Sequence, residues 1–494
     1  MKREAASHVV RTLFPAVLCR NLVALAVTCL AACGSASRPH SLVGVWSGTL
    51  ERGAAPSTLF FEVSVNPEGR LIAVLDVPAQ HVFGETLDTV TVSGRDVVMG
   101  WTLFALKFTG RFSSNGKTIR GVWTAGRFTS SLVLHPGSKP ERPRLAQDPI
   151  PPFPYDVADV RYKSPRAGIW IGGTLTKPHS ATPVAAVVLA AASGLDRDNS
   201  AGPGKPFLVL ADYLTRRGLA ILRIDSRGVG QSGGNWETST TADVADDVVA
   251  GVAFLKRQPG IDPGRIGAAG ASEGAAIAAI AAERSPDIKF IVMMVPMGIP
   301  GAEDGVLLRE KTDRAAGKSD TFIAFGSKLQ RQMFHIILTT QDDALATQKL
   351  DELWETTLAG ISHTGLTAAE QQGFREADTA YRDRVRRMTS PWERFILSYD
   401  PSSTLRDVHC QVLIVAGSAD LRASPKENLP PIAAALRTAG NQDVTIRELP
   451  GLTHNLQTAT SGVLSEETVS PAVLSTIGDW LVTHATARMP TSQP

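Results

Sequence analysis

The chain has 494 residues, of which 43% are hydrophobic and 20% charged, and its formal net charge at pH 7 is +2. This length accommodates two or three domains, the composition is that of a globular protein, and the near-neutral charge gives no support for binding nucleic acid. Three of the four cysteines lie in the first 33 residues, so neither a disulfide framework nor a cysteine-based metal site is expected.

Residues 1–33 have the features of a secretory signal. Basic residues precede the apolar run Leu22–Leu30, which is too short to span a bilayer. The run ends in Leu30-Ala31-Ala32-Cys33-Gly34, which resembles the lipobox of bacterial lipoproteins. That resemblance implies cleavage before Cys33, acylation of this cysteine, and an exported protein lipid-anchored to the cell envelope. The alternative is cleavage at a small-residue site, which would release a soluble exported protein.

Residues 41–135 predict an all-β accessory domain. Short β-branched and aromatic runs alternate with turn sequences, which is typical of a small antiparallel barrel or sandwich. The expected strands are Gly44–Leu50, Leu59–Val65, Leu71–Val77, Val90–Val92, Val97–Leu103, Lys107–Phe112, Ile119–Trp123 and Phe128–Leu134. Trp46, Trp101 and Trp123 are expected in its core rather than around a ligand cavity.

Seven prolines among residues 136–154 indicate an extended linker, and strand and helix patterns alternate over residues 155–490. This alternation predicts an α/β fold, a mostly parallel sheet covered by helices on both faces. Residues at about 297–400 interrupt the alternation with many helix formers. We expect them to form a helical cap over the carboxyl edge of the sheet rather than a surface decoration.

Residues Gly270-Ala271-Ser272-Glu273-Gly274 lie between an apolar strand and an alanine-rich helix. They fit the G-x-S-x-G nucleophile elbow in its strand–turn–helix setting. The two glycines permit a tight turn that places Ser272 at the amino end of the helix, where N–H groups favour a developing negative charge. The alternative is a helix of small residues packed closely on the sheet.

A serine hydroxyl needs a base to take its proton and a third group to orient that base. Asp420 follows the predicted strand Val412–Ala416, and His454 follows the predicted strand Val444–Leu449. Their order after Ser272 is the Ser–Asp–His order of α/β-hydrolases. The competing residues are expected at the opposite end of the sheet or on cap surfaces: Asp407, His409, His335 and His363.

An oxyanion hole needs two hydrogen-bond donors. The N–H of Glu273 is expected as the first, because it follows the nucleophile. The N–H of Leu195 is expected as the second, with Gly194 allowing close backbone approach in the loop after the first buried strand. The Glu273 side chain has two interpretations, a ligand for a substrate amine or an acid suited to the first turn of its helix.

These segments resemble the bacterial serine esterases of the α/β-hydrolase superfamily, in a secreted branch with a β-rich N-terminal extension. The resemblance covers about residues 150–485 and implies a carboxylic-ester hydrolase with the triad Ser272, Asp420 and His454. It further implies an acyl-enzyme intermediate, a small-molecule ester substrate, and no metal or cofactor. The chain departs from the usual family pattern at Ala192-Ser193-Gly194-Leu195 and after the acid, at Leu421-Arg422-Ala423.

Two other functions stay open at this point. One is a serine aminopeptidase or amidase of the same fold, with Glu273 or a cap carboxylate holding the substrate amine. The other is a surface binding lipoprotein whose hydrolase domain is vestigial. Dehalogenase and epoxide-hydrolase chemistry is disfavoured, because those α/β-hydrolases have aspartate where this chain has Ser272. Natural substrate, acyl-chain length and oligomeric state do not follow from the sequence.

Overall fold

The computed structural model describes residues 41–51, 56–66, 69–80, 82–101, 106–125, 128–141, 144–199, 204–459 and 467–486, which all belong to one unit, Ser41–Pro494. Cys33 and the rest of the signal segment lie outside the described residues, so lipidation stays a prediction. Within the described ranges, no helix is both long and apolar enough to cross a membrane.

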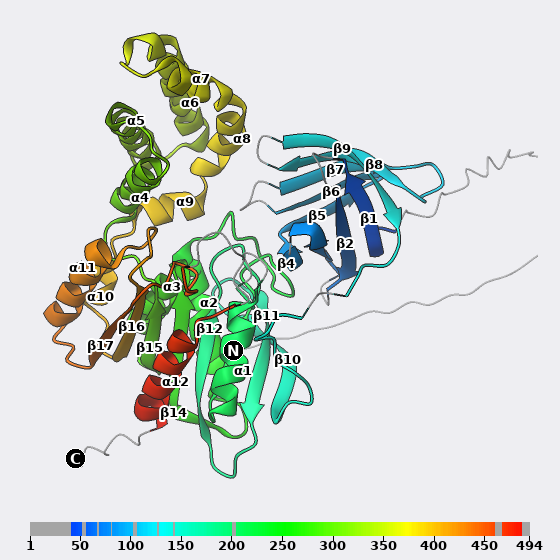
Figure 1. Cartoon of the computed structure of the whole chain (residues 1–494). Helices are drawn as coiled ribbons and strands as arrows, with labels where there is room; N and C mark the ends of the chain where they lie inside the picture. The colour runs from blue at the N-terminus through cyan, green and yellow to red at the C-terminus, as the bar shows by residue number, and fades with distance from the viewer. Residues whose placement is uncertain are drawn as a thin grey trace, which may run out of the picture. The chain divides into compact units, whose positions relative to one another are not determined.

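Residues 44–136 form a nine-stranded antiparallel sheet (Figure 1). Its strands are β1 (Gly44–Leu50), β2 (Ser57–Val65), β3 (Leu71–Val77), β4 (Val82–Leu87), β5 (Thr89–Ser93), β6 (Asp96–Trp101), β7 (Leu106–Phe112), β8 (Ile119–Ala125) and β9 (Phe128–Pro136). The strand order is β4-β3-β2-β1-β9-β8-β7-β6-β5, with a short 3₁₀ turn, η1 (Pro78–Gln80), after β3. Since β3 also contacts β5 and β4 contacts β6, the sheet folds over on itself.

The interior of this domain is a single apolar cluster. Apolar side chains alternate along the strands, as in β2, where Leu59, Phe61 and Val63 are buried. Trp46, Trp101 and Trp123 are also buried, as expected for core residues. Strand β4 was not expected, because Gly84 with φ +74° interrupts its short β-branched pattern.

The second sheet has eight strands in the order β10-β11-β13-β12-β14-β15-β16-β17. They are β10 (Tyr155–Ser164), β11 (Ile169–Pro178), β12 (Val184–Ala190), β13 (Ala220–Ile224), β14 (Ile261–Ala271), β15 (Ile288–Met294), β16 (Gln411–Gly417) and β17 (Val444–Leu449). The first two pair in antiparallel fashion, whereas the strands from β13 to β17 run parallel. The predicted α/β-hydrolase fold, preceded by an all-β domain, is confirmed.

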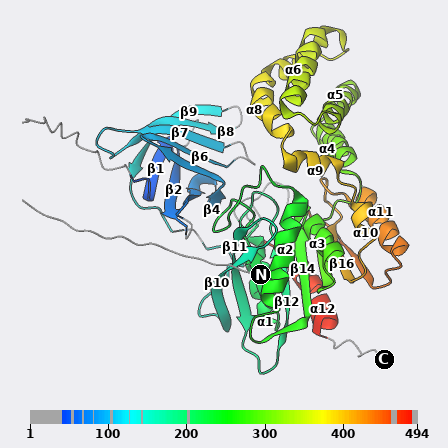
Figure 2. The same cartoon turned by 180° about the vertical axis from the view of Figure 1, so that it is seen from behind.

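Helices cover both faces of this sheet (Figure 2). On one face lie α2 (Thr241–Leu255), α3 (Glu273–Arg284), α10 (Pro401–Leu405) and α11 (Pro425–Thr438). On the other lie α1 (Pro206–Arg216) and α12 (Pro471–Thr486). Successive side chains of β12 enter the two apolar clusters in turn, which explains why this strand is apolar at every position.

A helical insertion separates β15 from β16. It contains α4 (Gly301–Ala315), α5 (Asp320–Thr339), α6 (Asp343–Gly360), the 3₁₀ turn η3 (Ile361–His363), α7 (Ala368–Glu376), α8 (Asp378–Met388) and α9 (Pro391–Ser398). These helices enclose an apolar cluster of their own, with Leu329, Trp354 and Phe374 among its buried members. The insertion therefore folds around its own core, and we refer to it as the cap.

Candidate active site

The backbone at Ser272 has the strained conformation of a nucleophile elbow. Ser272 joins β14 to α3 with φ +56° and ψ −117°, a region that non-glycine residues avoid. Its N–H donates to the carbonyl of Met294 at 2.9 Å. A Cβ on Gly270 would lie 2.2 Å from the Gly274 carbonyl oxygen, and one on Gly274 would lie 2.6 Å from that of Ala190. The turn therefore requires glycine at both flanking positions.

Asp420 and His454 lie together beyond the ends of the neighbouring strands β16 and β17. The Nδ1 atom of His454 is 2.8 Å from Oδ2 of Asp420. The other Asp420 oxygen accepts N–H groups of Arg422 at 2.8 Å and Ala423 at 2.9 Å. Burial favours a higher pKa for Asp420, but the hydrogen bond and charge of His454, together with these N–H groups, hold that pKa below its ordinary value. The Asp420 carboxylate thus stays ionised beside the imidazole.

The carboxyl ends of the strands bring the three predicted residues to one edge of the sheet. Ser272 follows β14 and Asp420 follows β16, and both of these strands border β15. Among the described contacts, His454 bonds to Asp420 and no hydrogen bond joins His454 to Ser272. Hydrogen bonds to the nucleophile are often long before substrate binds. An Nδ1–H donated to Asp420 leaves Nε2 as the acceptor that a base requires.

The loop that was expected to supply the second oxyanion donor has other partners. The N–H of Leu195 donates to the carbonyl of Ala192 at 3.0 Å, and that of Gly194 donates to Ser226 Oγ at 3.1 Å. The Leu195 side chain is buried in the apolar cluster of the β domain. In this conformation both N–H groups have acceptors within the protein, so the role of Leu195 as the second oxyanion donor stays a prediction.

The Glu273 side chain is buried and accepts four hydrogen bonds. Ser193 donates its N–H at 3.1 Å and its hydroxyl at 2.7 Å. Thr241 donates its hydroxyl at 2.7 Å, and Trp392 of α9 donates its indole N–H at 2.9 Å. In this conformation the Glu273 carboxylate is held by donors of the protein itself, which favours a structural role for it over that of an amine ligand. Sequence reasoning did not identify Thr241 or Trp392 as part of this network.

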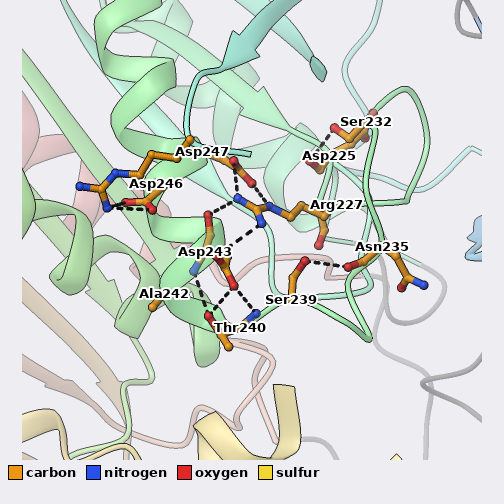
Figure 3. A network of polar contacts seen from close by, with 12 residues as sticks. Asp225, Arg227, Ser232, Asn235, Ser239, Thr240, Ala242, Asp243, Asp246 and Asp247 are labelled. Carbon is orange, nitrogen blue, oxygen red and sulfur yellow. Dashed lines mark hydrogen bonds and ion pairs between the residues drawn. The ribbon is translucent and has the colours of Figure 1, made fainter. Parts of the chain in front are cut away.

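A polar network orders the loop between β13 and α2 (Figure 3). Arg227 forms a two-point ion pair with Asp247 of α2, at 2.6 and 2.9 Å. Asp225 accepts both the Nε–H of Arg197 at 3.0 Å and the N–H of Gln231 at 2.9 Å. These residues organise the loop beside the elbow, which is a structural role.

Asp304, in the first turn of α4, is a cap carboxylate that the sequence did not single out. It is 7% exposed, and burial raises the pKa of its carboxyl to about 6, with the nearby Asp420 also raising it. Arg422, Lys311 and His454 are close enough to act in the opposite direction. Lys311 is itself paired with Glu427 at 2.7 Å. Asp304 thus lies near His454, and the nearby cationic groups do not fully offset the effect of burial on the pKa of its carboxyl. Among the residues described, no group of three histidine, cysteine or acidic side chains is arranged to hold a metal ion.

Comparison with known proteins identifies the following similarities. Residues 167–429, slightly more than half of the chain, match the family described as X-Pro dipeptidyl-peptidase (S15 family). A thiohydrolase of Arthrinium phaeospermum is 29% identical over 118 residues, and the match covers 22% of this chain and 38% of that protein.

Solved structures with similar folds have low sequence identity. An α/β hydrolase of Penicillium sp. sh18 is 14% identical with a TM-score of 0.42, covering 67% of this chain and 100% of that one. A Pyrococcus furiosus esterase is 13% identical with a TM-score of 0.41, covering 67% of this chain and 92% of that one. At such scores these neighbours add nothing about the substrate.

Proposed function

The chain belongs to the X-Pro dipeptidyl-peptidase (S15) family and is a serine hydrolase of the α/β fold, and from this premise we propose that it hydrolyses carboxylic esters. The observation that carries the proposal is the 2.8 Å hydrogen bond between His454 and Asp420, at the same sheet edge as the strained Ser272. Ester hydrolysis requires a nucleophile, an oriented base and a site for the oxyanion, and no separate receptor for a substrate amine.

In the proposed reaction, Ser272 Oγ attacks the ester carbonyl while His454 Nε2 takes the hydroxyl proton. Asp420 orients the ring and stabilises the imidazolium. The carbonyl oxygen becomes an oxyanion beside the amino end of α3, where the N–H of Glu273 is the expected donor. The bond between the acyl carbon and the alcohol oxygen then breaks, and His454 gives its proton to that leaving oxygen. Water, activated by His454, hydrolyses the acyl-enzyme and restores Ser272.

The test is the Ser272→Ala variant assayed with short p-nitrophenyl esters. Loss of the nucleophile is expected to lower kcat by a factor on the order of 10⁶, with the thermal unfolding temperature retained. A fluorophosphonate probe is expected to label the wild-type protein and not the variant. Wild-type turnover in the variant would reject Ser272 as the nucleophile.

Amide hydrolysis is a second candidate, and Asp304 is the observation that favours it. A buried carboxylate near His454 is a suitable partner for a substrate ammonium group, as a dipeptidyl-peptidase or aminopeptidase would require. A panel that compares aminoacyl- and X-Pro-p-nitroanilides with short-chain esters separates the two functions. A higher kcat/KM for the anilides, reduced by Asp304→Asn while ester turnover persists, would replace the ester proposal with the peptidase one.

A further inference from the structure

The buried carboxylate next to the nucleophile connects three parts of the chain. Glu273 directly follows Ser272, and its donors come from the loop after β12, from the start of α2 and from cap helix α9. None of these four donors is a lysine or arginine. The carboxylate is therefore held by neutral donors and by the amino end of its own helix α3.

Among the described contacts, Trp392 is the only donor to Glu273 that belongs to the cap. Its indole N–H donates to Glu273 Oε1, the atom that also accepts the hydroxyls of Ser193 and Thr241. The indole N–H cannot reverse its direction as a hydroxyl can, so it has to find an acceptor or water. The position of α9 and that of the Glu273 carboxylate are thus coupled through one bond of 2.9 Å.

A second contact leads from Trp392 to the same loop. The rings of Trp392 and Trp236 meet edge to face, with centroids 5.7 Å apart and an interplanar angle of 85°. Trp236 in turn packs against Gly194, where an added Cβ would lie 3.1 Å from the indole. Trp392 therefore contacts the loop of Ser193 and Gly194 through both Glu273 and Trp236.

We propose that Trp392 is a positioning residue, which holds the elbow and the loop after β12 in the arrangement required for acyl transfer. This inference rests on the proposed serine-hydrolase function, and applies to ester and amide substrates alike. Without the indole N–H, the Glu273 carboxylate loses one of its four donors and α9 loses its polar attachment to the elbow. Small displacements of reacting groups reduce the rate of chemistry more than the binding of substrate.

The test compares Trp392→Phe with a matched control, Trp354→Phe. Trp354 of α6 also donates its indole N–H to a carboxylate, Asp378 Oδ1 at 2.8 Å, but this bond lies within the cap. Both variants exchange an indole that bonds a carboxylate for a phenyl ring. Rates are expressed per active site titrated with the fluorophosphonate probe, so that unfolded protein does not contribute.

We expect Trp392→Phe to lower kcat roughly tenfold or more, with little change in KM. Trp354→Phe is expected to lower the unfolding temperature and leave kcat per active site unchanged. Equal kcat values for the two variants would overturn the positioning role. If the wild-type protein reacts with neither probe nor substrate, the proposed function itself is wrong.

A double-mutant cycle with Glu273→Gln tests whether Trp392 acts through Glu273. Trp392→Phe removes one donor to the Glu273 side chain, and Glu273→Gln removes one acceptor oxygen from the same network. The double variant is therefore expected to lose less activity than the product of the two separate losses. Losses that multiply would show that Trp392 acts independently of Glu273, which would contradict the inference. Glu273→Gln alone is also expected to lower kcat, because the glutamine NH₂ faces donors where the carboxylate accepted them.

Discussion

The two sheets of this protein use their strands differently. In the nine-stranded antiparallel sheet, buried and exposed side chains alternate, and the buried tryptophans fill the interior of the domain. In the eight-stranded sheet, the central strands β12 and β13 are buried at every position, and the polar residues of the candidate site follow the strand ends.

This difference shows why chemistry is expected in one region and not in the other. The carboxyl ends of parallel strands meet at one edge, so the loops after β12, β14, β16 and β17 converge there. In an antiparallel sheet successive strands end at opposite edges, so their loops separate. Substitutions at the parallel edge should therefore affect activity, and substitutions in the antiparallel sheet should affect stability.

After Ser272→Ala, the largest effect at the parallel edge is expected for Asp420→Asn. The asparagine amide favours the wrong tautomer of His454, which leaves Nε2 protonated and unable to act as a base. We expect kcat for a short ester to fall by about 10⁴. Circular dichroism should show a folded protein. An unchanged kcat would exclude Asp420 as the acid. It would also mean that catalysis does not depend on this residue at the carboxyl edge of the parallel sheet.

A smaller effect, of the opposite kind, is expected for Phe61→Ala in β2. Phe61 is fully buried, with its ring centroid 6.1 Å from that of Phe108 and 6.0 Å from that of Trp123. The cavity should lower the free energy of unfolding by about 3–5 kcal/mol, as measured by urea denaturation. Val122→Ala, at an exposed position of β8, is the control and should change it by less than about 0.5 kcal/mol.

The activity of the Phe61→Ala variant tests whether the antiparallel sheet contributes to the candidate active site. If the antiparallel sheet only encloses its own core, kcat per titrated active site should equal that of the wild-type protein. A lower kcat in the fraction that remains folded would show that this sheet also supports the site.

The smallest effect is expected for Asp304→Asn in the cap. Burial raises the pKa of Asp304 from its ordinary value to about 6, so the folded protein binds this proton more tightly than the unfolded chain does. Both states are protonated well below pH 4. The destabilisation grows between about pH 4 and 6, where the unfolded chain releases this proton and the folded protein keeps it, and it is complete above about pH 6. The variant should be more stable than wild type by about 3 kcal/mol at pH 8, and the difference should largely disappear below pH 4.

Urea denaturation over this pH range measures the difference between Asp304→Asn and the wild-type protein. A pH-independent difference would mean that Asp304 is neutralised in the folded protein, by Arg422 or Lys311. In that case the Asp304 carboxylate would not be available to bind a substrate ammonium group, and the peptidase alternative would lose its supporting observation.

Much of the α/β domain was predictable because its signals are local. The continuous apolar run of β12 and the five residues around Ser272 contain the information for a buried strand and a tight turn. Asp420 and His454 could be chosen as candidates from the sequence because each follows a buried or half-buried strand. Their 2.8 Å contact is seen only in the structure. Strand β4 was missed because its glycine weakens the pattern.

The hydrogen-bond partner of Leu195 was not predictable, for a different reason. Its N–H and that of Gly194 were assigned by position in the loop, but the acceptors of these groups depend on the packing of that loop. Ser226, which accepts from Gly194, lies 32 residues further along the chain. No local pattern contains a partner at that distance.

Neighbouring residues encode the strand and helix periodicity and the elbow, and the order of Ser272, Asp420 and His454 can be read directly along the chain. The surroundings of these residues, in contrast, depend on how distant segments pack. Trp392 reaches Glu273 across 119 residues, and Asp304 of the cap lies near His454, since the folded sheet and cap bring these segments together. Burial then changes their chemistry: it gives Glu273 four donors, and it raises the pKa of Asp304.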